Sequence, residues 1–390
     1  MSLEVISLGC RMNLSESEDM RALLAGSEDL VVVNSCAVTA EAVRQTRQAI
    51  RRARRRRPDA RLLVTGCAAE VERDSLAAMP EVDGLIANAA KLDARAWNRP
   101  AASPAPSAQH TRAFVSVQNG CDHACTFCII PQGRGPSRSL RVEAVLETIA
   151  HHLGHGVSEV VLSGVDLTSW GADLPGTPRL GSLVAAILQA FPGLPRLRLS
   201  SLDGIEIDPL LLDLIAGEPR VMPHLHLSLQ SGDDLILKRM KRRHTRADAV
   251  RLVESLRTQR PDIAIGADLI AGFPTESLEA HAANLSIIAE LGIVHGHVFP
   301  YSPRPGTPAA RMPQLAAPEI RARAAELRSA VAEERSTRLA AHLGHPLEVL
   351  AERDGTGHAP DFARVRLPGE TPAGTLVTLV PTRIVEGMLA

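Results

Sequence analysis

Three cysteines in one short segment carry the clearest chemical signal of this sequence. Cys121, Cys125 and Cys128 follow the spacing C-x3-C-x2-C, so three thiolates on one loop can hold three corners of a cubic iron–sulfur cluster. Clusters of this kind usually take four cysteines, and no fourth cysteine follows in this segment. We therefore interpret these residues as a cluster site in which one iron stays open to bind another molecule.

Two other interpretations of the cysteines are weaker. A zinc site needs a fourth ligand. His123 could supply it, but no second ligand pair follows at finger-like spacing. Six cysteines is an even number, which is compatible with a disulfide framework, but such frameworks are typical of short secreted chains. This sequence has 390 residues, and charged and polar residues begin at Glu4 without a basic and then apolar leader. We expect a cytoplasmic protein.

Each of the other three cysteines comes just after a predicted strand. The pairs are Glu4–Leu8 with Cys10, Leu30–Asn34 with Cys36, and Leu62–Thr65 with Cys67. Helices predicted near Glu16–Ala25 and Thr39–Arg57 separate these strands, an alternation typical of a parallel sheet. Ligands of such sheets bind beyond the carboxyl ends of the strands, so the three cysteines should converge there as a second cluster site. Three buried free cysteines are the alternative.

Strands and helices are predicted to alternate again over residues 113–342. The expected strands are Ala113–Gln118, Glu159–Ser163, Arg196–Ser200, His224–Leu229, Ile263–Ile270 and Val294–Phe299. Six such units predict a partial TIM-like barrel, whose functional loops lie at the C-terminal strand ends. We therefore expect an α/β fold with an N-terminal parallel-sheet domain (1–100), an Ala/Pro/Ser-rich linker (101–112), the barrel (113–342) and a small all-β domain (343–390).

Composition and charge limit the partners of the chain. No apolar stretch approaches the ~20 residues that a membrane helix needs, so no membrane partner is expected. The formal net charge is −1, but eight arginines crowd the predicted helix Thr39–Arg57. Such a run is either a solvated face or a contact for phosphate, and we favour contact with RNA. Aromatic residues form only 2% of the chain, which argues against a base-stacking surface.

The motifs together resemble a known family. Residues 121–131, CDHACTFCIIP, resemble the signature of radical S-adenosylmethionine (SAM) enzymes. The segments LGCRMN (8–13), NSCAVT (34–39) and TGC (65–67) look like the N-terminal domain of methylthiotransferases, and HLSLQSG (226–232), DLIAGFP (268–274) and YSPRPGT (301–307) match further along. The chain is thus identified as a member of the radical SAM methylthiotransferase family. Its final β segment resembles a TRAM domain, a small RNA-binding barrel.

The resemblance implies conversion of an aromatic C–H bond into C–S–CH3. Unactivated C–H bonds resist acid–base chemistry, so a radical is needed and the cofactor supplies it. One [4Fe–4S] cluster would cleave SAM to a 5′-deoxyadenosyl radical, and a second would present the sulfur that is methylated and transferred. The implied ligands are Cys121, Cys125 and Cys128 for the first cluster and Cys10, Cys36 and Cys67 for the second. Further implied partners are an electron donor such as flavodoxin or ferredoxin and a sulfur source.

The resemblance also implies where SAM would lie. The residues expected to contact it are Phe127, Gly164, Asp166, Ser200, Gln230 and Asp268. Gly164 and Asp166 occupy the segment that binds the SAM amino group in the family. For the strand-end polar residues, ordinary hydrogen bonding or helix capping is the alternative. Arg134 and Arg138 are expected to meet RNA phosphate or the SAM carboxylate, with a solvated loop as the alternative.

The family has three branches. They act on threonylcarbamoyladenosine in tRNA, on isopentenyladenosine in tRNA, and on an aspartate of a ribosomal protein. CAVT (36–39) and HVFPYS (297–302) look most like the first, whereas the Met12-Asn13 pair also occurs in the second. We expect methylthiolation at carbon 2 of N6-threonylcarbamoyladenosine, next to the anticodon in the tRNA anticodon stem-loop. Arg304 would suit the anionic threonyl group, unless it forms a structural pair.

An alternative function for the whole chain is that of a non-catalytic iron–sulfur protein that binds RNA.

Overall fold

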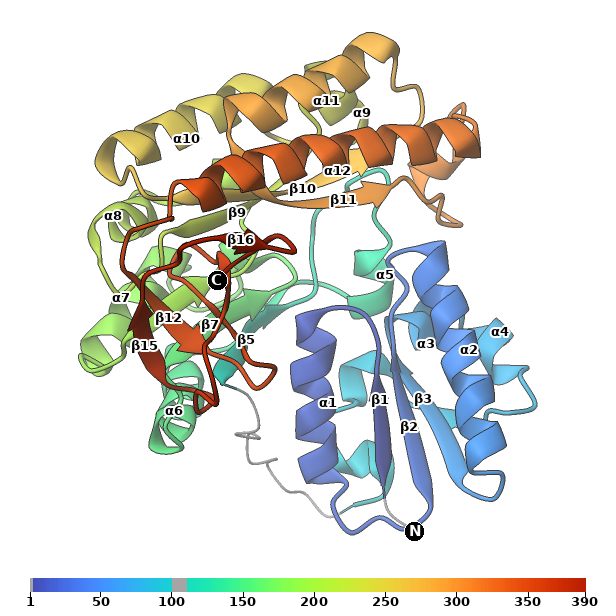
Figure 1. Ribbon diagram of the computed structural model, residues 1–390. Helices are drawn as coiled ribbons and strands as arrows, with labels where there is room; N and C mark the ends of the chain where they lie inside the picture. The colour runs from blue at the N-terminus through green and yellow to red at the C-terminus, as the bar shows by residue number, and fades with distance from the viewer. Residues whose placement is uncertain (1–2, 100–110) are drawn as a thin grey trace. The chain divides into compact units, whose positions relative to one another are not determined.

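The computed structural model describes residues 3–99 and 111–390 (Figure 1). The chain forms two compact units, and each is described by itself. Unit 1 comprises Met1–Ser107, Asn119–Arg138 and Ser302–Ala310, and unit 2 comprises Ala108–Gln118, Ser139–Tyr301 and Arg311–Ala390. Residues 101–110 of the predicted linker lie outside the described residues, and the predicted domain limits stay predictions.

A parallel sheet forms the centre of unit 1, which confirms the predicted N-terminal fold. Its order is β1 (Glu4–Ser7), β2 (Leu30–Ser35), β3 (Arg61–Gly66) and β4 (Gly84–Leu85). Alternate residues of the β2 run LVVVNS serve two cores. Val31 and Val33 pack with Ile50 of α2 (Ala40–Arg56), whereas Val32 packs with Met20 of α1 (Arg11–Leu23). Helices thus cover both faces, and for this reason β2 reads as one apolar run.

The remaining elements of unit 1 are short. They are α3 (Cys67–Val71), α4 (Arg73–Ala77), η1 (Asn88–Ala90), η2 (Ala94–Trp97), α5 (Ile130–Arg134) and η5 (Pro308–Arg311), the last of which ends one residue into unit 2. Strand β6 (Arg138–Ser139) lies where the chain passes from unit 1 to unit 2.

Unit 2 contains the partial barrel of six parallel strands that the sequence predicts. The strands are β5 (Arg112–Asn119), β7 (Glu159–Gly164), β8 (Arg196–Leu199), β9 (His224–Gln230), β10 (Ala264–Ala271) and β11 (Ile293–Pro300). Strands β5, β7 and β8 pair in one group and β9, β10 and β11 in another, and two parallel bridges, Leu197 with Val221 and Leu202 with Leu227, connect the groups. The predicted α/β barrel class is therefore confirmed.

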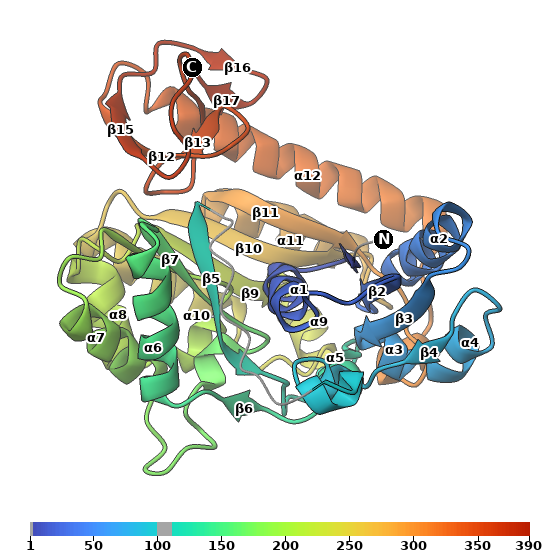
Figure 2. The same cartoon turned by 90° about the horizontal axis from the view of Figure 1, so that it is seen from below.

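Seven helices follow the barrel strands in the described part of unit 2. They are α6 (Val142–Gly154), α7 (Leu180–Ala190), α8 (Pro209–Gly217), α9 (Asp234–Arg239), α10 (Arg246–Gln259), α11 (Leu278–Glu290) and α12 (Ala317–Ala340), with short turns η3 (Leu167–Ser169) and η4 (Gly204–Glu206) between them. Helix α12 runs along β11 (Figure 2). The close approach requires Gly296, because a Cβ there would lie 2.5 Å from Val331 of α12.

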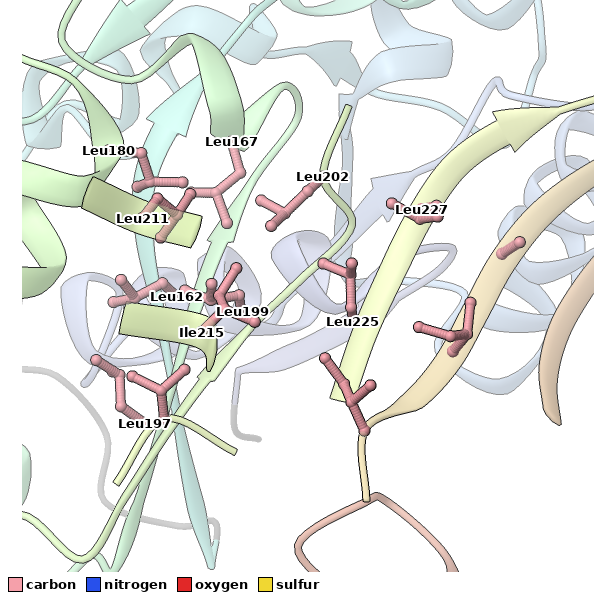
Figure 3. Close-up of a cluster of buried hydrophobic side chains, with 14 of the residues drawn as sticks. Leu162, Leu167, Leu180, Leu197, Leu199, Leu202, Leu211, Ile215, Leu225 and Leu227 are labelled. Atoms are coloured by element: carbon pink, nitrogen blue, oxygen red, sulfur yellow. The ribbon is translucent and has the colours of Figure 1, made fainter. Parts of the chain in front are cut away.

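Side chains along each barrel strand alternate between two faces, one that packs against the surrounding helices and one that points into the barrel. Leu225 and Leu227 of β9 belong to the same buried cluster as Leu211 and Ile215 of α8 (Figure 3). His224 and His226, which alternate with these leucines along β9, therefore face the other way, toward the interior of the barrel. The same alternation places Asp268 of β10 on the inner face, because Ala267 and Leu269 belong to the buried cluster.

The C-terminal residues form an all-β sheet, as predicted. The order is β15 (Leu376–Leu379), β12 (Leu347–Ala351), β13 (Thr356–His358), β14 (Arg364–Arg366), β17 (Met388–Leu389) and β16 (Ile384–Val385), with β14 and β17 parallel and the other pairs antiparallel. Strands β16 and β17 have two residues each, too few to show an alternating pattern. The likeness to a TRAM domain stays a prediction.

Buried charges tie this sheet to the starts of the barrel strands. Arg196 opens β8 and donates to the backbone oxygens of Glu348 and His358 at 2.7 and 3.1 Å. Arg198 donates to the backbone oxygen of Pro360 at 3.0 Å and packs over the ring of Phe362 at 4.9 Å. Because β7 and β8 begin here, the C-terminal sheet covers the amino-terminal end of these strands, the end remote from the functional loops expected of such barrels.

Asp19 of α1 gives unit 1 a pH-dependent stability. Burial, with Glu16 and Glu18 nearby, raises the pKa of Asp19 from 3.8 to about 6. The folded state therefore holds this proton more tightly than the unfolded chain, and the stabilisation is lost as pH rises through about 6. We expect Asp19→Asn to increase the free energy of unfolding by about 1 kcal/mol more at pH 7 than at pH 5. Urea titrations at both pH values measure this difference, and an equal effect at both would contradict it.

Candidate functional site

Cys10, Cys36 and Cys67, here called the N-terminal cysteine trio, meet at the carboxyl edge of the unit 1 sheet. Cys10 precedes α1, Cys36 follows β2, and Cys67 begins α3 directly after β3. Burial raises the pKa of the Cys36 and Cys67 thiols, and each of them is close enough to Cys10 for that thiol to raise its pKa further. The structure thus brings together three thiols that are far apart in the sequence.

Two glycines make this convergence sterically possible. Gly9 has φ +94°, and a Cβ there would lie 2.6 Å from the Cβ of Cys36. Gly66 has φ +91°, and its Cβ would lie 2.4 Å from the backbone oxygen of Ser35. Side chains at either position would force the strand ends apart, and non-glycine residues rarely adopt this backbone conformation. The motifs LGC and TGC therefore have a steric basis.

Cys121, Cys125 and Cys128, here called the central cysteine set, lie on the loop before α5. The loop folds back on itself, since the Cys121 N–H donates to the Gly135 oxygen at 3.1 Å and the Cys128 N–H donates to the Cys125 oxygen at 3.2 Å. The His123 N–H points at the Cys121 sulfur at 3.4 Å, a donor of the kind that tunes iron–sulfur potentials. None of the six cysteines, all within the described residues, forms a disulfide.

Helices α3 and α5 connect the two cysteine sets within unit 1. The two helices pack together in unit 1. A Cβ on Gly133 of α5 would lie 3.1 Å from the Cys67 Cβ. Asn88 joins the same place, because its Nδ2 donates to the Gly133 oxygen at 2.6 Å and lies 3.9 Å from the Cys67 sulfur. No sequence motif pointed to Asn88, which begins the short helix η1.

The interpretation of Arg134 as a contact for phosphate or for the SAM carboxylate is wrong. Its side chain is 2% exposed and pairs with Glu16 at 2.9 Å. It also donates to the side-chain oxygens of Asn13 and Asn119 at 2.6 and 2.9 Å. Sequence reasoning missed this pair because Glu16 lies 118 positions earlier. Arg138 of the same loop is exposed, and its guanidinium donates to the Arg134 backbone oxygen at 3.4 Å.

Arg304 also proves to be a structural residue. Its side chain is 4% exposed and pairs with Glu72 at 3.3 Å within unit 1. Thr307 donates its hydroxyl to the Arg304 oxygen at 2.8 Å and holds the turn. The role of Arg304 toward an anionic substrate group is therefore wrong, and the alternative of a structural pair holds.

The arginine helix α2 has more acidic partners than its sequence neighbourhood indicates. Glu41 of α2 itself and carboxylates from other elements pair with these arginines, the last of which, Arg57, directly follows the helix. The pairs are Arg44 with Glu41, Arg47 with Glu72, Arg51 with Glu81, Arg54 with Asp83, Arg56 with Glu4, and Arg57 with Glu4 and Asp29. Arg52 and Arg55 are exposed, and no carboxylate of residues 3–99 or 111–390 forms an ion pair with them. An anion would therefore find fewer unpaired arginines on this helix than the eight that the sequence contains.

The predicted SAM contacts in unit 2 lie on four neighbouring strands or just after them. Gly164 ends β7, and the N–H of nearby Asp166 donates to Gln118 Oε1 at 2.9 Å. Ser200 follows β8, and its hydroxyl is buried without a hydrogen-bond partner among the described residues. Gln230 ends β9 with φ +71°. Phe127 lies with the central cysteine set in unit 1. Contact of these residues with SAM stays a prediction.

Asp268 lies inside β10 rather than at its end, between two histidines. His226 Nε2 and His297 Nδ1 both lie 3.1 Å from the same Asp268 oxygen. Hydrogen bonds from the two rings hold the pKa of Asp268 well below its usual range. The sequence contained a signal for this cluster, because HLH in β9 and HGH in β11 place histidines two residues apart on one strand face.

The comparisons define the class of protein. Residues 115–285 match the Radical SAM superfamily, and residues 2–87 match the Uncharacterized protein family UPF0004. The fold resembles two solved cobalamin-binding radical SAM proteins. TsrM from Kitasatospora setae has a TM-score of 0.54 at 15% identity, over 77% of this chain and 69% of that one. OxsB has a TM-score of 0.54 at 11% identity, over 85% of this chain and 56% of that one.

Relatives of known name cover almost the whole chain. The threonylcarbamoyladenosine tRNA methylthiotransferase MtaB of Rickettsia prowazekii is 42% identical over 99% of this chain and 96% of its own length. The protein of the same name from Chlamydia pneumoniae is 34% identical over 99% and 96%. The tRNA-2-methylthio-N(6)-dimethylallyladenosine synthase of Chloroflexus aurantiacus is 32% identical over 97% and 88%.

The partial barrel, the central cysteine set and the superfamily match together define a radical SAM enzyme, which uses SAM and a [4Fe–4S] cluster. Within that class, the chain belongs to the methylthiotransferase family. Its three thiols on one loop, with a backbone N–H directed at Cys121, fit a cluster with one open iron. In residues 3–99 and 111–390, no helix is long and apolar enough to span a membrane.

Proposed function

We propose that this chain methylthiolates carbon 2 of N6-threonylcarbamoyladenosine in tRNA, at the adenosine just 3′ of the anticodon. The observation that carries the proposal is the identity of 42% with the Rickettsia protein named for this substrate, against 32% with the Chloroflexus protein named for dimethylallyladenosine. The same proposal includes an electron donor such as flavodoxin or ferredoxin, a sulfur source, and an RNA contact by the C-terminal β domain.

Each cysteine set would hold one [4Fe–4S] cluster. SAM, when bound, supplies both the methyl group and the radical that activates the C–H bond. The central cysteine set would hold the cluster that SAM meets. The Gln118 side chain accepts from the Asp166 N–H at 2.9 Å. This hydrogen bond fixes the backbone of Asp166, and with it the position of the Asp166 carboxylate just after β7. Asp268, kept ionised by its two histidines, would place a negative charge on the inner face of the barrel. Such a charge suits the ammonium and sulfonium groups of SAM.

The N-terminal cysteine trio supports a second cluster. Its thiols converge at one sheet edge without forming a disulfide. We expect anaerobically reconstituted protein to bind about eight irons per chain and the Cys121/Cys125/Cys128→Ala variant about four, since each cubic cluster holds four. Iron and sulfide assays with absorbance near 400 nm measure this. A triple variant without iron would show that the trio is not an independent cluster site.

The exposed arginines of α2 are expected to contact tRNA phosphate. Arg52 and Arg55 have no ion-pair partner among the described residues, so replacing both with Gln removes charge without breaking a pair. We expect weaker tRNA binding and a slope of log affinity against log salt that is smaller by up to about 0.9 per lost contact. Filter binding at several salt concentrations measures the slope. Arg54→Gln, which removes an arginine paired with Asp83, serves as the control, and equal slopes for all proteins would mean a solvated face.

Substrate choice is the direct test of the proposal. Purified, reconstituted enzyme is given SAM, reductant and three tRNAs that carry threonylcarbamoyladenosine, isopentenyladenosine or unmodified adenosine. Mass spectrometry of the nucleosides should find the methylthio product only with the first tRNA. Preferential turnover of the second would move the chain to the other tRNA branch, and 5′-deoxyadenosine formation without any tRNA product would favour a protein substrate.

A further inference from the structure

Glu16, Lys91 and Arg134 form a buried network of charges next to the N-terminal cysteine trio. Glu16 accepts from Lys91 Nζ at 2.6 Å and pairs with Arg134 at 2.9 Å. The exposed fractions of the three side chains are 5%, 2% and 2%. All three belong to unit 1, but they come from α1, from the segment after η1 and from the end of α5.

Asparagines from the cysteine motifs complete this network. Asn13, three residues after Cys10, accepts from Arg134 and donates to the backbone oxygens of Leu8 and Ser35. Asn34, two residues before Cys36, donates to the Asn13 oxygen at 2.9 Å and lies 3.4 Å from Lys91 Nζ. The network therefore holds the backbone on both sides of the trio in place.

The charges of this network do not balance. Two cations, Arg134 and Lys91, share the single carboxylate of Glu16. A buried charge without a counter-charge is strongly unfavourable, and a guanidinium does not lose its proton. The trio lies beside this excess positive charge. A Cβ on Gly133, the residue before Arg134, would lie 3.1 Å from the Cys67 Cβ, and Asn13, which accepts from Arg134 at 2.6 Å, is three residues after Cys10. The site is therefore built for an anionic occupant.

We propose that Arg134 and Lys91 are positioning residues that set the reduction potential of the cluster held by the N-terminal cysteine trio. This inference rests on the proposed second cluster. Reduction adds one electron to the cluster from an external reductant such as dithionite, and no bond forms or breaks. Nearby buried cations stabilise the more negative, reduced state. Arg134 ends α5 and so links this site to the segment of the central cysteine set.

The test measures a potential, because a purely structural residue would not shift it with a definite sign. The full-length Cys121/Cys125/Cys128→Ala protein, which keeps only the trio cluster, is titrated with dithionite and followed by electron paramagnetic resonance. In this background, Arg134→Gln and Lys91→Gln should each reduce the ratio of reduced to oxidised cluster at a fixed potential about tenfold, which corresponds to 59 mV for one electron. Glu16→Gln should raise that ratio about tenfold.

Two further variants separate charge from folding. Arg134→Lys keeps the cation and should hold the ratio within about threefold of the parent. Arg95→Gln removes an exposed arginine near Lys91 and should leave the ratio unchanged. If Arg134→Gln does not fold, the opposite signs for Lys91→Gln and Glu16→Gln still test the idea. Equal ratios of reduced to oxidised cluster in all iron-containing variants would contradict the role of Arg134 and Lys91 but not the second cluster. Loss of iron from the Cys121/Cys125/Cys128→Ala parent would contradict both the second cluster and this role.

Discussion

Cys125→Ala is expected to abolish SAM cleavage, whereas Cys36→Ala is expected to leave cleavage intact and stop methylthiolation. Cys125 belongs to the central cysteine set and Cys36 to the N-terminal trio, and the proposed clusters on these sets do different work. We expect 5′-deoxyadenosine formation by Cys125→Ala to fall by more than about a hundredfold, since even loss of an outer partner of a metal ligand lowers activity 10- to 100-fold.

Each of these two variants is the control for the other. Chromatographic assay of 5′-deoxyadenosine and mass spectrometry of tRNA nucleosides are run on both proteins, with circular dichroism to confirm folding. Cys36 is buried, so its truncation also tests whether the edge of the unit 1 sheet tolerates the lost side chain. A folded Cys36→Ala protein that no longer forms 5′-deoxyadenosine would contradict the division of labour between the two sets.

Glu159→Gln is expected to destabilise unit 2 by about 3–5 kcal/mol, because it leaves buried arginines without their carboxylate. Glu159 is fully buried and pairs with Arg198 at 2.9 Å, with Arg196 3.9 Å away. These arginines hold the pKa of Glu159 below its usual range despite complete burial. Urea unfolding monitored by circular dichroism measures the change in free energy.

A matched variant distinguishes this buried pair from an ordinary ion pair. Glu348 pairs with the same Arg196 at 3.0 Å, but its side chain is 54% exposed. Glu348→Gln should therefore change the free energy of unfolding by no more than about 1 kcal/mol. Similar losses for the two variants would mean that the barrel base does not depend on the charge of Glu159.

The sequence predicted the elements of this fold well because most of them are local patterns. The apolar runs of β2 and β7 and the alternation of β9 were sufficient to place the strands within one or two residues. The convergence of Cys10, Cys36 and Cys67 followed from parallel topology. Contacts between residues that are far apart in the sequence leave no local pattern, and the wrong predictions concern such contacts. Arg134 and Arg304 were assigned to ligands because their carboxylate partners, Glu16 and Glu72, lie far away in the sequence.

The same limit affected the arginine helix. Its acids come from β1 and from segments near β4, so a count within one segment overstated its free positive charge. The histidine pairs of β9 and β11 carried a periodic signal that the prediction did not use. Short strands such as β16 and β17 contain two residues each, too few for any periodic pattern.

The anchoring of the C-terminal sheet by Arg196 and Arg198 means that this domain is not a detachable module. Cutting the chain after α12 would remove the backbone oxygens of Glu348, His358 and Pro360 and the ring of Phe362, and so leave two arginines at the barrel base facing solvent. Truncated proteins made to measure the RNA contribution of this domain would therefore report lost barrel stability together with lost affinity. Point substitutions on its exposed face are the sounder route to that measurement.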